Sequence, residues 1–187
     1  MEIDANESLR AFDDEGFFAD ALPVPSANFD ARATGDICLL VIHNISLPPD
    51  EFGGDGVARL FTNTLDRDAH PYYKTIPAGR VSSHFFIRRD GQLIQFVSCL
   101  QRAWHAGVST WQGRERCNDF SIGIELEGSD NVPFTDAQYA MLHTLSIALR
   151  KAFPIRGIAG HSHIAPGRKT DPGPYFDWQR YLSRLAG

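Results

Sequence analysis

The chain of 187 residues contains no apolar run that approaches the roughly 20 residues needed to span a bilayer. Its acidic N-terminus, residues 1–7, is followed by no continuous apolar segment and no small-residue cleavage site, so a secretory signal is not expected. Internal repeats and low-complexity tracts are missing as well. These absences predict a protein that is neither exported nor embedded in a membrane.

Cysteine is scarce. Cys38, Cys99 and Cys117 are an odd number at wide spacing, which fits neither a disulfide framework nor a zinc knuckle and suits a reducing cytoplasm. We expect Cys38 and Cys99, which lie in apolar stretches, to be small core residues. Cys117 follows Arg116 in a polar segment and is the candidate for an accessible thiol, although a cysteine nucleophile is disfavoured.

Positive charge is also in short supply. The chain has 18 Lys and Arg against 23 Asp and Glu, which gives a formal net charge of −5. Broad binding to nucleic acid needs basic surfaces that release counterions, so this class of partner is excluded. An anionic ligand would require a locally basic cleft.

What remains is an ordinary globular composition, 43% hydrophobic and 22% charged, in a chain long enough for one domain with one core. The first 35 residues are acidic, punctuated by proline and without a sustained helical or strand period. We expect residues 1–35 to form an arm packed on the domain, and residues 36–187 to form the domain. A monomer is the default expectation.

The strand signals are clear. The apolar run Cys38–Ile42, closed by His43, predicts the first core strand. A hairpin is expected from strands at 83–88 and 92–97, because the Asp-Gly in the turn at 89–91 is a strong turn signal. Residues 121–128 alternate, so that one strand face carries Ile122, Ile124 and Leu126 and the other carries Gly123, Glu125 and Glu127.

Helices are expected between these strands. A short helix is predicted near 57–61 and a final one over 178–185. The longest begins after Thr135, the N-cap of a capping box with Gln138, and stops at Phe153 before a proline. Strands interrupted by helices, with one antiparallel hairpin, predict an α/β fold in which a single domain has a central mixed β-sheet flanked by helices.

A segment rich in proline and glycine, residues 160–174, is predicted to be a loop that carries two histidines, a lysine and an aspartate. His161 and Asp171 resemble half of a metal site, and His43 is the expected third ligand. His163 is the alternative if the local chain is extended, and Asp171 could instead simply begin a turn. Two histidines and one aspartate make an open zinc site, where the pKa of a bound water falls to roughly 7. The pattern favours hydrolysis.

Glu125 is unusual because charged side chains inside strands are depleted unless their face meets solvent or a cleft. Beside a metal it could move the attacking proton to the leaving amine, and Glu127 on the same face competes for this role. Lys169 could stabilise an oxyanion, although a solvated loop lysine is the simpler interpretation.

Other polar residues have weaker signals. Trp104 offers a flat ring for a sugar's apolar face, and core packing explains it equally well. His70 and His143 are expected to be surface or hydrogen-bonded histidines. Three arginines could make bidentate contacts to carboxylates, namely Arg80, Arg114 and Arg116. Most arginines in proteins are merely solvated.

Five ordered segments together resemble a known family. They are residues 41–49, 80–84, 102–109, 113–128 and 168–174. From about residue 22 to about residue 180 the chain is similar to the AmpD-type anhydro-N-acetylmuramyl-L-alanine amidases of bacteria. The resemblance implies the zinc amidase fold shared with peptidoglycan recognition proteins and phage amidases.

The resemblance also implies roles for individual residues. The zinc ligands would be His43, His161 and Asp171, and the catalytic pair would be Glu125 and Lys169. One departure is His163, where some relatives carry a different polar residue. Recognition of sugar and stem peptide would fall to Asn44, Arg80, Trp104 and Arg116.

The implied substrate is a small-molecule anhydromuropeptide, cleaved between the lactyl group and L-alanine during peptidoglycan recycling in the bacterial cytoplasm. A non-catalytic peptidoglycan-fragment recognition module is the alternative, because members of the wider fold lose a zinc ligand and bind without cutting. A second rival is a non-haem iron oxygenase, which also uses two histidines and a carboxylate. Its usual tight His-x-Asp arrangement is missing here.

Overall fold

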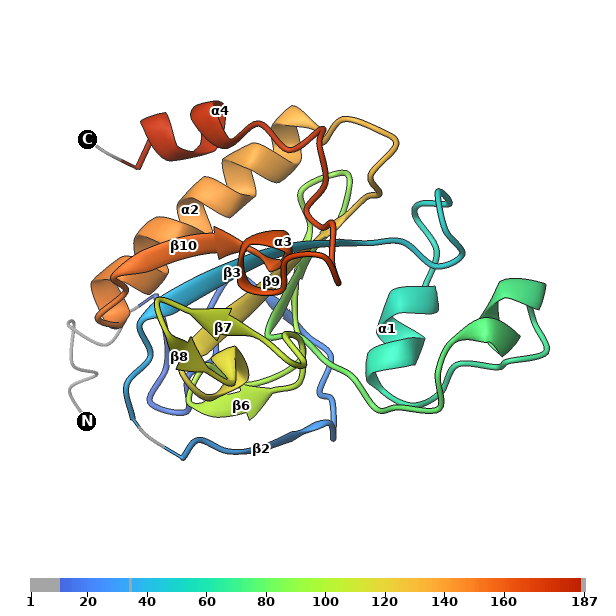
Figure 1. Cartoon of the computed structure of the whole chain (residues 1–187), viewed down its shortest axis with the longest axis horizontal. Coiled ribbons are helices and arrows are strands. Elements are labelled where there is room, and N and C mark those ends of the chain that lie inside the picture. Colours follow the sequence, from blue (N-terminus) through green and yellow to red (C-terminus); the bar gives the residue numbers. More distant parts are fainter. Residues whose placement is uncertain (1–10, 34, 186–187) are drawn as a thin grey trace, which may run out of the picture.

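The computed structural model describes residues 11–33 and 35–185, so the first ten residues of the predicted arm lie outside it. A six-stranded sheet has the order β1-β5-β4-β9-β3-β10. Its strands β10, β3 and β9 lie side by side in Figure 1. Neighbours pair in parallel except β4 and β5, which form the antiparallel hairpin. The predicted mixed sheet is therefore confirmed. Its strands are β1 (Leu22–Pro23), β3 (Leu39–Ile45), β4 (Phe85–Ile87), β5 (Leu93–Gln95), β9 (Ser121–Glu127) and β10 (Gly157–Gly160).

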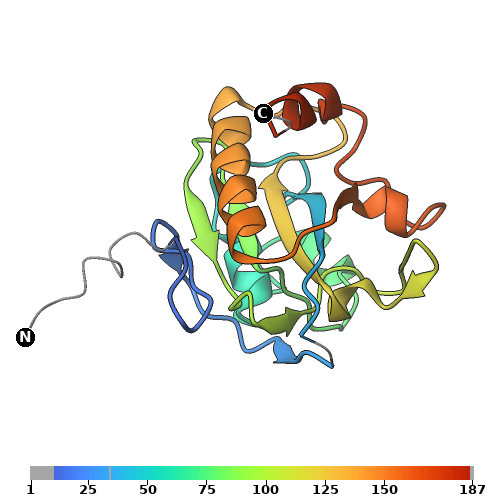
Figure 2. The same ribbon diagram turned by 90° about the vertical axis from the view of Figure 1, so that its left-hand side faces the viewer.

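Alternation along the strands divides the core between the two sheet faces. Leu40 and Ile42 of β3 pack on one face with the apolar side chains of β9, as their period of two predicts. This face is covered by α2 (Asp136–Ala152) and α4 (Trp178–Ser183). In Figure 2, α2 and the hairpin of β7 (Thr110–Trp111) and β8 (Arg114–Glu115) lie on opposite sides of β3 and β9.

The other face is covered by short elements and loops. α1 (Gly56–Phe61) packs over one part of it, and the β7–β8 hairpin with a 3-10 helix (Cys117–Asp119) packs over another. His43 and Glu125 belong to this second face, so the sheet presents them away from α2. The remaining short elements are β2 (Phe29–Ala31), β6 (Gln101–Ala103), β7 (Thr110–Trp111), β8 (Arg114–Glu115), a 3-10 helix at Pro71–Thr75 and α3 (His161–Ile164).

The helix signals in the sequence hold closely. Thr135 caps α2, and its hydroxyl accepts from the Gln138 N–H at 3.1 Å while the Gln138 side chain accepts from the Thr135 N–H at 3.0 Å. The predicted capping box is thereby confirmed. α4 ends at Ser183, two residues earlier than predicted.

The segment 160–174 differs from its prediction as a loop, because it opens with the helical turn of α3. The strand β10 before it was also not predicted. Its pairing to β3 is made by backbone groups of a glycine-rich stretch that has no strong apolar alternation.

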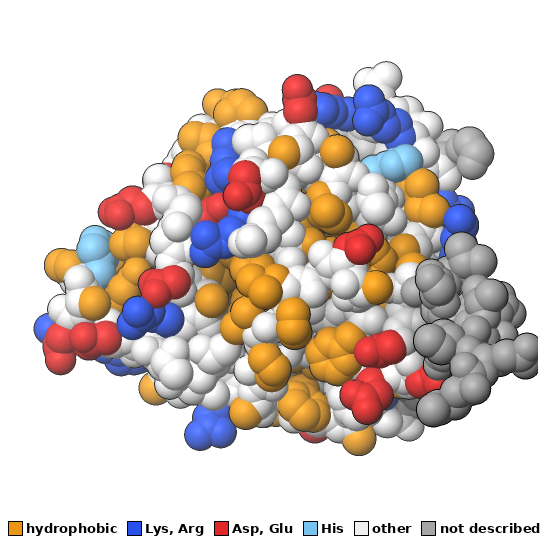
Figure 3. All heavy atoms as spheres, turned by 180° about the vertical axis from the view of Figure 1, so that it is seen from behind, with side chains coloured by type: hydrophobic (Ala, Val, Ile, Leu, Met, Phe, Trp, Pro, Cys, Tyr) orange, Lys and Arg blue, Asp and Glu red, His pale blue; other side chains and the backbone are white. Residues whose placement is uncertain are grey.

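The described part of the N-terminal region contacts the sheet. β1 extends the sheet beside β5, and β2 pairs with β6. Phe12 and Phe18 are buried with ring centroids 5.1 Å apart, and Phe18 N–H donates to Gln95 Oε1 at 2.7 Å. The division between arm and domain near residue 35 stays a prediction. On the side seen in Figure 3, hydrophobic side chains gather over the middle of the face.

All three cysteines are buried and free. For Cys38 and Cys99 this confirms the prediction. For Cys117 the expectation of an accessible thiol is wrong, because the 3-10 helix turns its side chain into the cluster around Phe120. Burial raises the pKa of the Cys117 thiol, which weakens it further as a nucleophile. None of the helices within residues 11–33 and 35–185 has the length and apolar character needed to traverse a bilayer.

Candidate metal centre and active site

The candidate site lies where three parallel strands present polar side chains at their carboxyl-terminal halves. His43 of β3 is in register with Glu125 of β9. Gly160, the last residue of β10, is in register with Ile42, so that His161 follows directly beside His43. Parallel pairing of β3, β9 and β10 thus brings together residues that are far apart in the sequence.

Asp171 reaches the same point from the loop after α3. Its carbonyl oxygen accepts the Ser162 N–H at 2.9 Å, which holds this loop against the start of α3. Asp171 Oδ2 lies 2.9 Å from His43 Nδ1 and 3.1 Å from His161 Nδ1, and the two imidazole nitrogens are 3.0 Å apart. Two buried imidazoles and one carboxylate therefore point single donor atoms at one place.

The polarity of these three atoms fits a divalent cation. His161 Nε2 lies 3.0 Å from the Ala106 carbonyl oxygen, which only accepts, so a neutral His161 carries its proton there and presents a lone pair at Nδ1. Burial lowers the pKa of His43 to about 4, so this imidazole is neutral at neutral pH. Ligand atoms at tetrahedral angles on bonds of about 2.0–2.1 Å would be about 3.3 Å apart, close to the spacing here.

Glu125 stands beside the three donor atoms. Its Oε1 lies 4.0 Å from His43 Nδ1, and its Oε2 is buried without a hydrogen-bond partner among the described residues. Burial, with the charge of Asp171 adding to it, raises the pKa of Glu125 well above its ordinary value, and Lys169 opposes this rise. An unpartnered carboxylate of raised pKa beside a cation site is suited to proton transfer.

Lys169 and Asn44 line an open groove of about 380 Å³ that reaches Asp171. Lys169 is exposed, and its charge acts on both Glu125 and His43. The Asn44 side-chain amide donates at 2.8 Å to Oδ1 of Asp130, which also lines the groove. The groove therefore combines polar and apolar lining residues and reaches the donor atoms at Asp171.

The other three predicted recognition residues are not among the residues that line this groove. Trp104 is partly buried, and its Nε1 has no hydrogen-bond partner among the described residues. Arg80 is exposed. Arg116 is largely exposed, adopts a left-handed backbone conformation and pairs with Asp119 at 3.2 Å. Their roles in substrate recognition stay predictions.

Two alternatives from the sequence are wrong. His163 points away from the donor atoms, because α3 is helical and not extended there. Its Nδ1 accepts the Gly160 N–H at 3.0 Å and its ring lies 5.1 Å from that of Trp178. Glu127 does not share the site either, since its carboxylate accepts backbone N–H groups of Gly53 and Arg89.

One residue at the site had no predicted role. His105 Nδ1 lies 3.0 Å from His43 Nε2, and burial lowers the pKa of His105 well below its ordinary value, so that the ring is neutral. His105 was one of seven histidines, and its spacing to the ligand candidates carried no signal. Only the fold shows that the segment after β6 lies over β3 and β9.

Comparison with known proteins agrees with this geometry. The family model described as N-acetylmuramoyl-L-alanine amidase matches residues 33–174. The chain is similar to the 1,6-anhydro-N-acetylmuramyl-L-alanine amidase AmpD of Citrobacter freundii, with 56% identity over 176 residues that cover 92% of this chain and 94% of the relative.

Solved structures are similar as well. The crystal structure of a selenomethionine AmpD derivative has a TM-score of 0.89 at 56% identity and covers 91% of this chain and 97% of that one. The Escherichia coli amidase AmiD, solved as a complex with the substrate anhydro-N-acetylmuramic acid-L-Ala-D-gamma-Glu-L-Lys, has a TM-score of 0.59 at 32% identity, covering 83% of this chain and 60% of that one. The chain therefore belongs to the N-acetylmuramoyl-L-alanine amidase family.

Proposed function

We propose that this amidase is a zinc enzyme that hydrolyses the amide between the lactyl group of 1,6-anhydro-N-acetylmuramic acid and L-alanine. The observation that carries the proposal is the convergence of His43, His161 and Asp171 beside the unpartnered carboxylate of Glu125. Two nitrogens and one carboxylate oxygen are a ligand set that catalytic zinc favours.

The reaction divides among the residues of the site. Zinc held by His43, His161 and Asp171 would polarise the amide carbonyl and lower the pKa of a bound water. Glu125 takes the proton from the attacking water and delivers it to the L-alanine nitrogen as the C–N bond breaks. The Lys169 ammonium stabilises the negative charge that develops on the carbonyl oxygen. No covalent bond to the protein forms.

The substrate class rests on the relatives and on the groove. AmpD of Citrobacter freundii is named for the 1,6-anhydro substrate, and AmiD was solved with an anhydromuropeptide. Asn44 and Lys169 in the groove offer hydrogen bonds and positive charge to the lactyl and peptide carbonyls. We assign Arg80, Trp104 and Arg116 to the outer contacts with sugar and stem peptide.

The proposed setting is peptidoglycan recycling by a monomer in the bacterial cytoplasm. Three free and buried cysteines, 38, 99 and 117, suit a reducing compartment. Analytical ultracentrifugation of the purified protein measures its mass in solution and so tests whether it is a monomer. Fractionation of cells that make the full-length chain tests the compartment.

The decisive experiment is mass spectrometry of anhydro-N-acetylmuramyl tripeptide incubated with the protein as isolated, after chelation and after zinc is restored. Free tripeptide is expected in the zinc-loaded samples alone. Intact substrate in every sample would favour a non-catalytic recognition module. Activity that follows iron and oxygen instead of zinc would favour an oxygenase.

Asp171→Asn supplies the matched variant, because it keeps the side-chain shape and removes the charge that a dication requires. We expect zinc affinity to fall by at least about tenfold and turnover to fall with it, while binding of the intact muropeptide persists. Unchanged turnover in this variant would reject the proposed ligand set.

A further inference from the structure

A row of polar contacts leads from His43 away from the groove and into the core. His43 Nε2 lies 3.0 Å from His105 Nδ1, and His105 Nε2 lies 3.3 Å from Ser121 Oγ. The Ser121 hydroxyl lies 2.6 Å from the Cys117 carbonyl oxygen. Ser121 and Cys117 are fully buried, so the far end of this row is closed to solvent.

The carbonyl end sets the direction of every hydrogen bond in the row, because a carbonyl oxygen only accepts. Ser121 donates its hydroxyl proton to Cys117, so Ser121 Oγ accepts from His105 Nε2–H. A neutral His105 with its proton on Nε2 has an acceptor at Nδ1. His43 therefore carries its proton on Nε2 and presents the lone pair of Nδ1 to Asp171 and His161.

The second histidine is held by the next residue in the chain. His161 Nε2 lies 3.0 Å from the Ala106 carbonyl oxygen, which only accepts, so Nε2–H donates there. The Arg168 guanidinium donates to the same oxygen at 2.8 Å and lies farther from His161 Nε2, at 3.4 Å. Residues 105 and 106 thus accept the Nε2–H groups of both imidazoles. His105 accepts from His43 through its side chain, and Ala106 accepts from His161 through its carbonyl oxygen. The Nδ1 atoms of both imidazoles are left unprotonated, and this is the form of imidazole that binds a metal ion.

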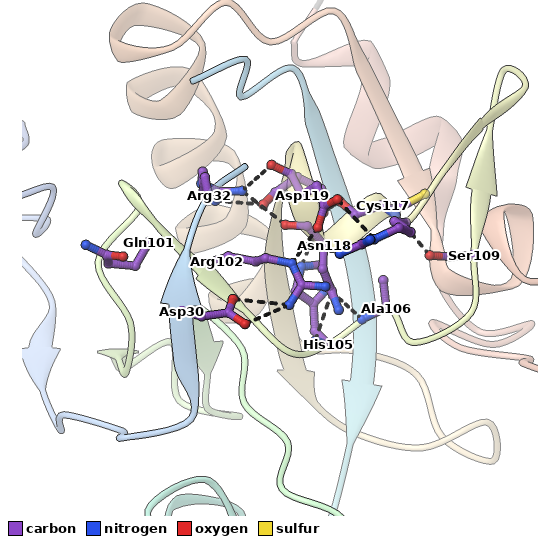
Figure 4. Close-up of polar contacts among 12 residues, drawn as sticks. Asp30, Arg32, Gln101, Arg102, His105, Ala106, Ser109, Cys117, Asn118 and Asp119 are labelled. Carbon is purple, nitrogen blue, oxygen red and sulfur yellow. Dashed lines mark hydrogen bonds and ion pairs between the residues drawn. The ribbon is translucent and has the colours of Figure 1, made fainter. Parts of the chain in front are cut away.

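Asn118 holds this dipeptide in place. Its Oδ1 accepts the N–H of His105 at 3.1 Å and the N–H of Ala106 at 2.8 Å (Figure 4). Its own carbonyl oxygen accepts from the Arg32 guanidinium at 3.1 Å. Asn118 is buried, so water competes poorly for these bonds.

We propose that His105 is a positioning residue that fixes the tautomer and ring orientation of His43, and that Asn118 fixes the dipeptide that serves both histidines. This inference rests on the metal role proposed above for His43 and His161. It adds a requirement that the donor atoms alone do not reveal, namely a hydrogen-bond acceptor at the position of His105 Nδ1.

The test uses two substitutions of nearly equal shape, His105→Asn and His105→Leu. Asn places its Oδ1 close to the position of the imidazole Nδ1, whereas Leu offers no acceptor. We expect His105→Leu to raise the zinc dissociation constant about 10–100-fold and His105→Asn to stay within a few-fold of the unmodified protein. Competition with a chromophoric chelator measures both, and the visible spectrum of the Co²⁺-loaded proteins reports the coordination of His43.

Urea unfolding of the metal-free proteins serves as the control for folding. The two variants should have similar urea concentrations at the unfolding midpoint. Equal zinc affinity in the Asn and Leu variants, whether high or low, would reject a positioning role for His105. If the unmodified protein binds no zinc, the proposed metal site fails and this inference falls with it. If that protein binds zinc and cleaves substrate while His105→Leu matches it in affinity, the positioning role alone is rejected.

Asn118 is tested in the same way. Asn118→Asp keeps an acceptor for the two backbone N–H groups, and Asn118→Leu removes it. We expect zinc affinity to fall at least about tenfold further in the Leu variant than in the Asp variant. Matching affinities in the two variants would show that Asn118 does not act through residues 105–106.

Discussion

His43 and Glu125 face each other across neighbouring parallel strands, in register, with His43 Nδ1 4.0 Å from Glu125 Oε1. The separation keeps the carboxylate out of the set of donor atoms and within reach of a water molecule held there. The same backbone pairing thus places both the proposed ligand His43 and the proposed proton acceptor Glu125, and neither depends on a loop.

Glu125→Gln should therefore separate metal binding from catalysis. The amide keeps the shape of the carboxyl group and cannot take up a proton, so kcat should fall by about 10²–10⁴-fold while zinc content stays at the unmodified level. Steady-state kinetics and metal analysis of the same preparation measure both. Glu115→Gln, at an exposed position of β8, makes the same change of carboxylate to amide away from the site and should retain kcat. Loss of zinc in the Glu125 variant would contradict this division.

Lys169→Met should lower kcat by about 10²–10³-fold with a smaller change in KM, because the ammonium acts on charge that appears only in the transition state. Lys151→Met at the end of α2 is the control for loss of an exposed lysine. A change confined to KM would instead make Lys169 a substrate-binding residue.

His84 predicts a dependence of stability on pH. Its Nδ1 accepts the Gly123 N–H at 3.0 Å, and burial, together with the nearby Arg32 charge, lowers its pKa to about 3. In the unfolded chain the pKa is about 6.5, so the stabilising contribution is complete above that pH and is lost as the pH falls toward 3. Each such histidine adds a slope of about 1.4 kcal/mol per pH unit.

His84→Asn keeps an acceptor for the Gly123 N–H and cannot titrate. The unfolding free energy is measured by urea titration with a chelator present, at several pH values between 7 and 4.5. In this variant, the dependence of the unfolding free energy on pH should correspond to about one fewer proton taken up on unfolding. His43, whose pKa is lowered to about 4, keeps contributing in both proteins. Parallel curves for the two proteins would show that His84 is not the titrating group.

Gly123→Ala should disturb the proposed metal centre without changing any of its three candidate ligands. A Cβ at position 123 would lie 2.6 Å from His105 Cγ, so the imidazole must move from its place over β9. We expect a loss of about 1–3 kcal/mol in unfolding free energy and weaker zinc binding. Gly79→Ala has open space around the added methyl group and serves as the control. Unchanged zinc affinity would mean that the His105 ring tolerates displacement.

Arg32 should be required for stability. Its guanidinium donates to the carbonyl oxygens of Cys99, Asn118, Asp119 and Ser121 at 2.9–3.2 Å. Lysine has fewer donors and no planar fork, so Arg32→Lys should lower the unfolding free energy by about 2–4 kcal/mol in denaturant titration. Arg67→Lys, an exposed arginine with one bond to Pro77 O, should change it little. Equal effects at the two positions would contradict the network described here.

Local patterns predicted much of the fold. α2 and β9 have long periodic stretches with a capping box or strict alternation, and both lie within one residue of their predicted bounds. β10 and the short strands β1, β2, β6, β7 and β8 carry almost no such pattern, because backbone pairing to another strand decides them. The burial of Cys117 was missed for the same reason, since its polar neighbours in sequence are not its neighbours in space.

The candidate site shows the same division. Residue types and the resemblance placed His43, His161, Asp171 and Glu125 together, and the structure brings these side chains to one point. The hydrogen bonds by which His105 and Asn118 position the two histidines could not be predicted. They join segments that are separate in the sequence, and no local sequence pattern indicates that these segments are in contact.

His43 and His161 are 118 positions apart in the chain, and His43 and Asp171 are 128 positions apart. The proposed donor set is therefore incomplete in any chain whose synthesis has not yet passed residue 171. Under the proposed ligand set, retention of the ion would report that synthesis has passed Asp171 and that β10 has paired with β3. A truncated or unassembled chain would be marked by its inability to retain the ion.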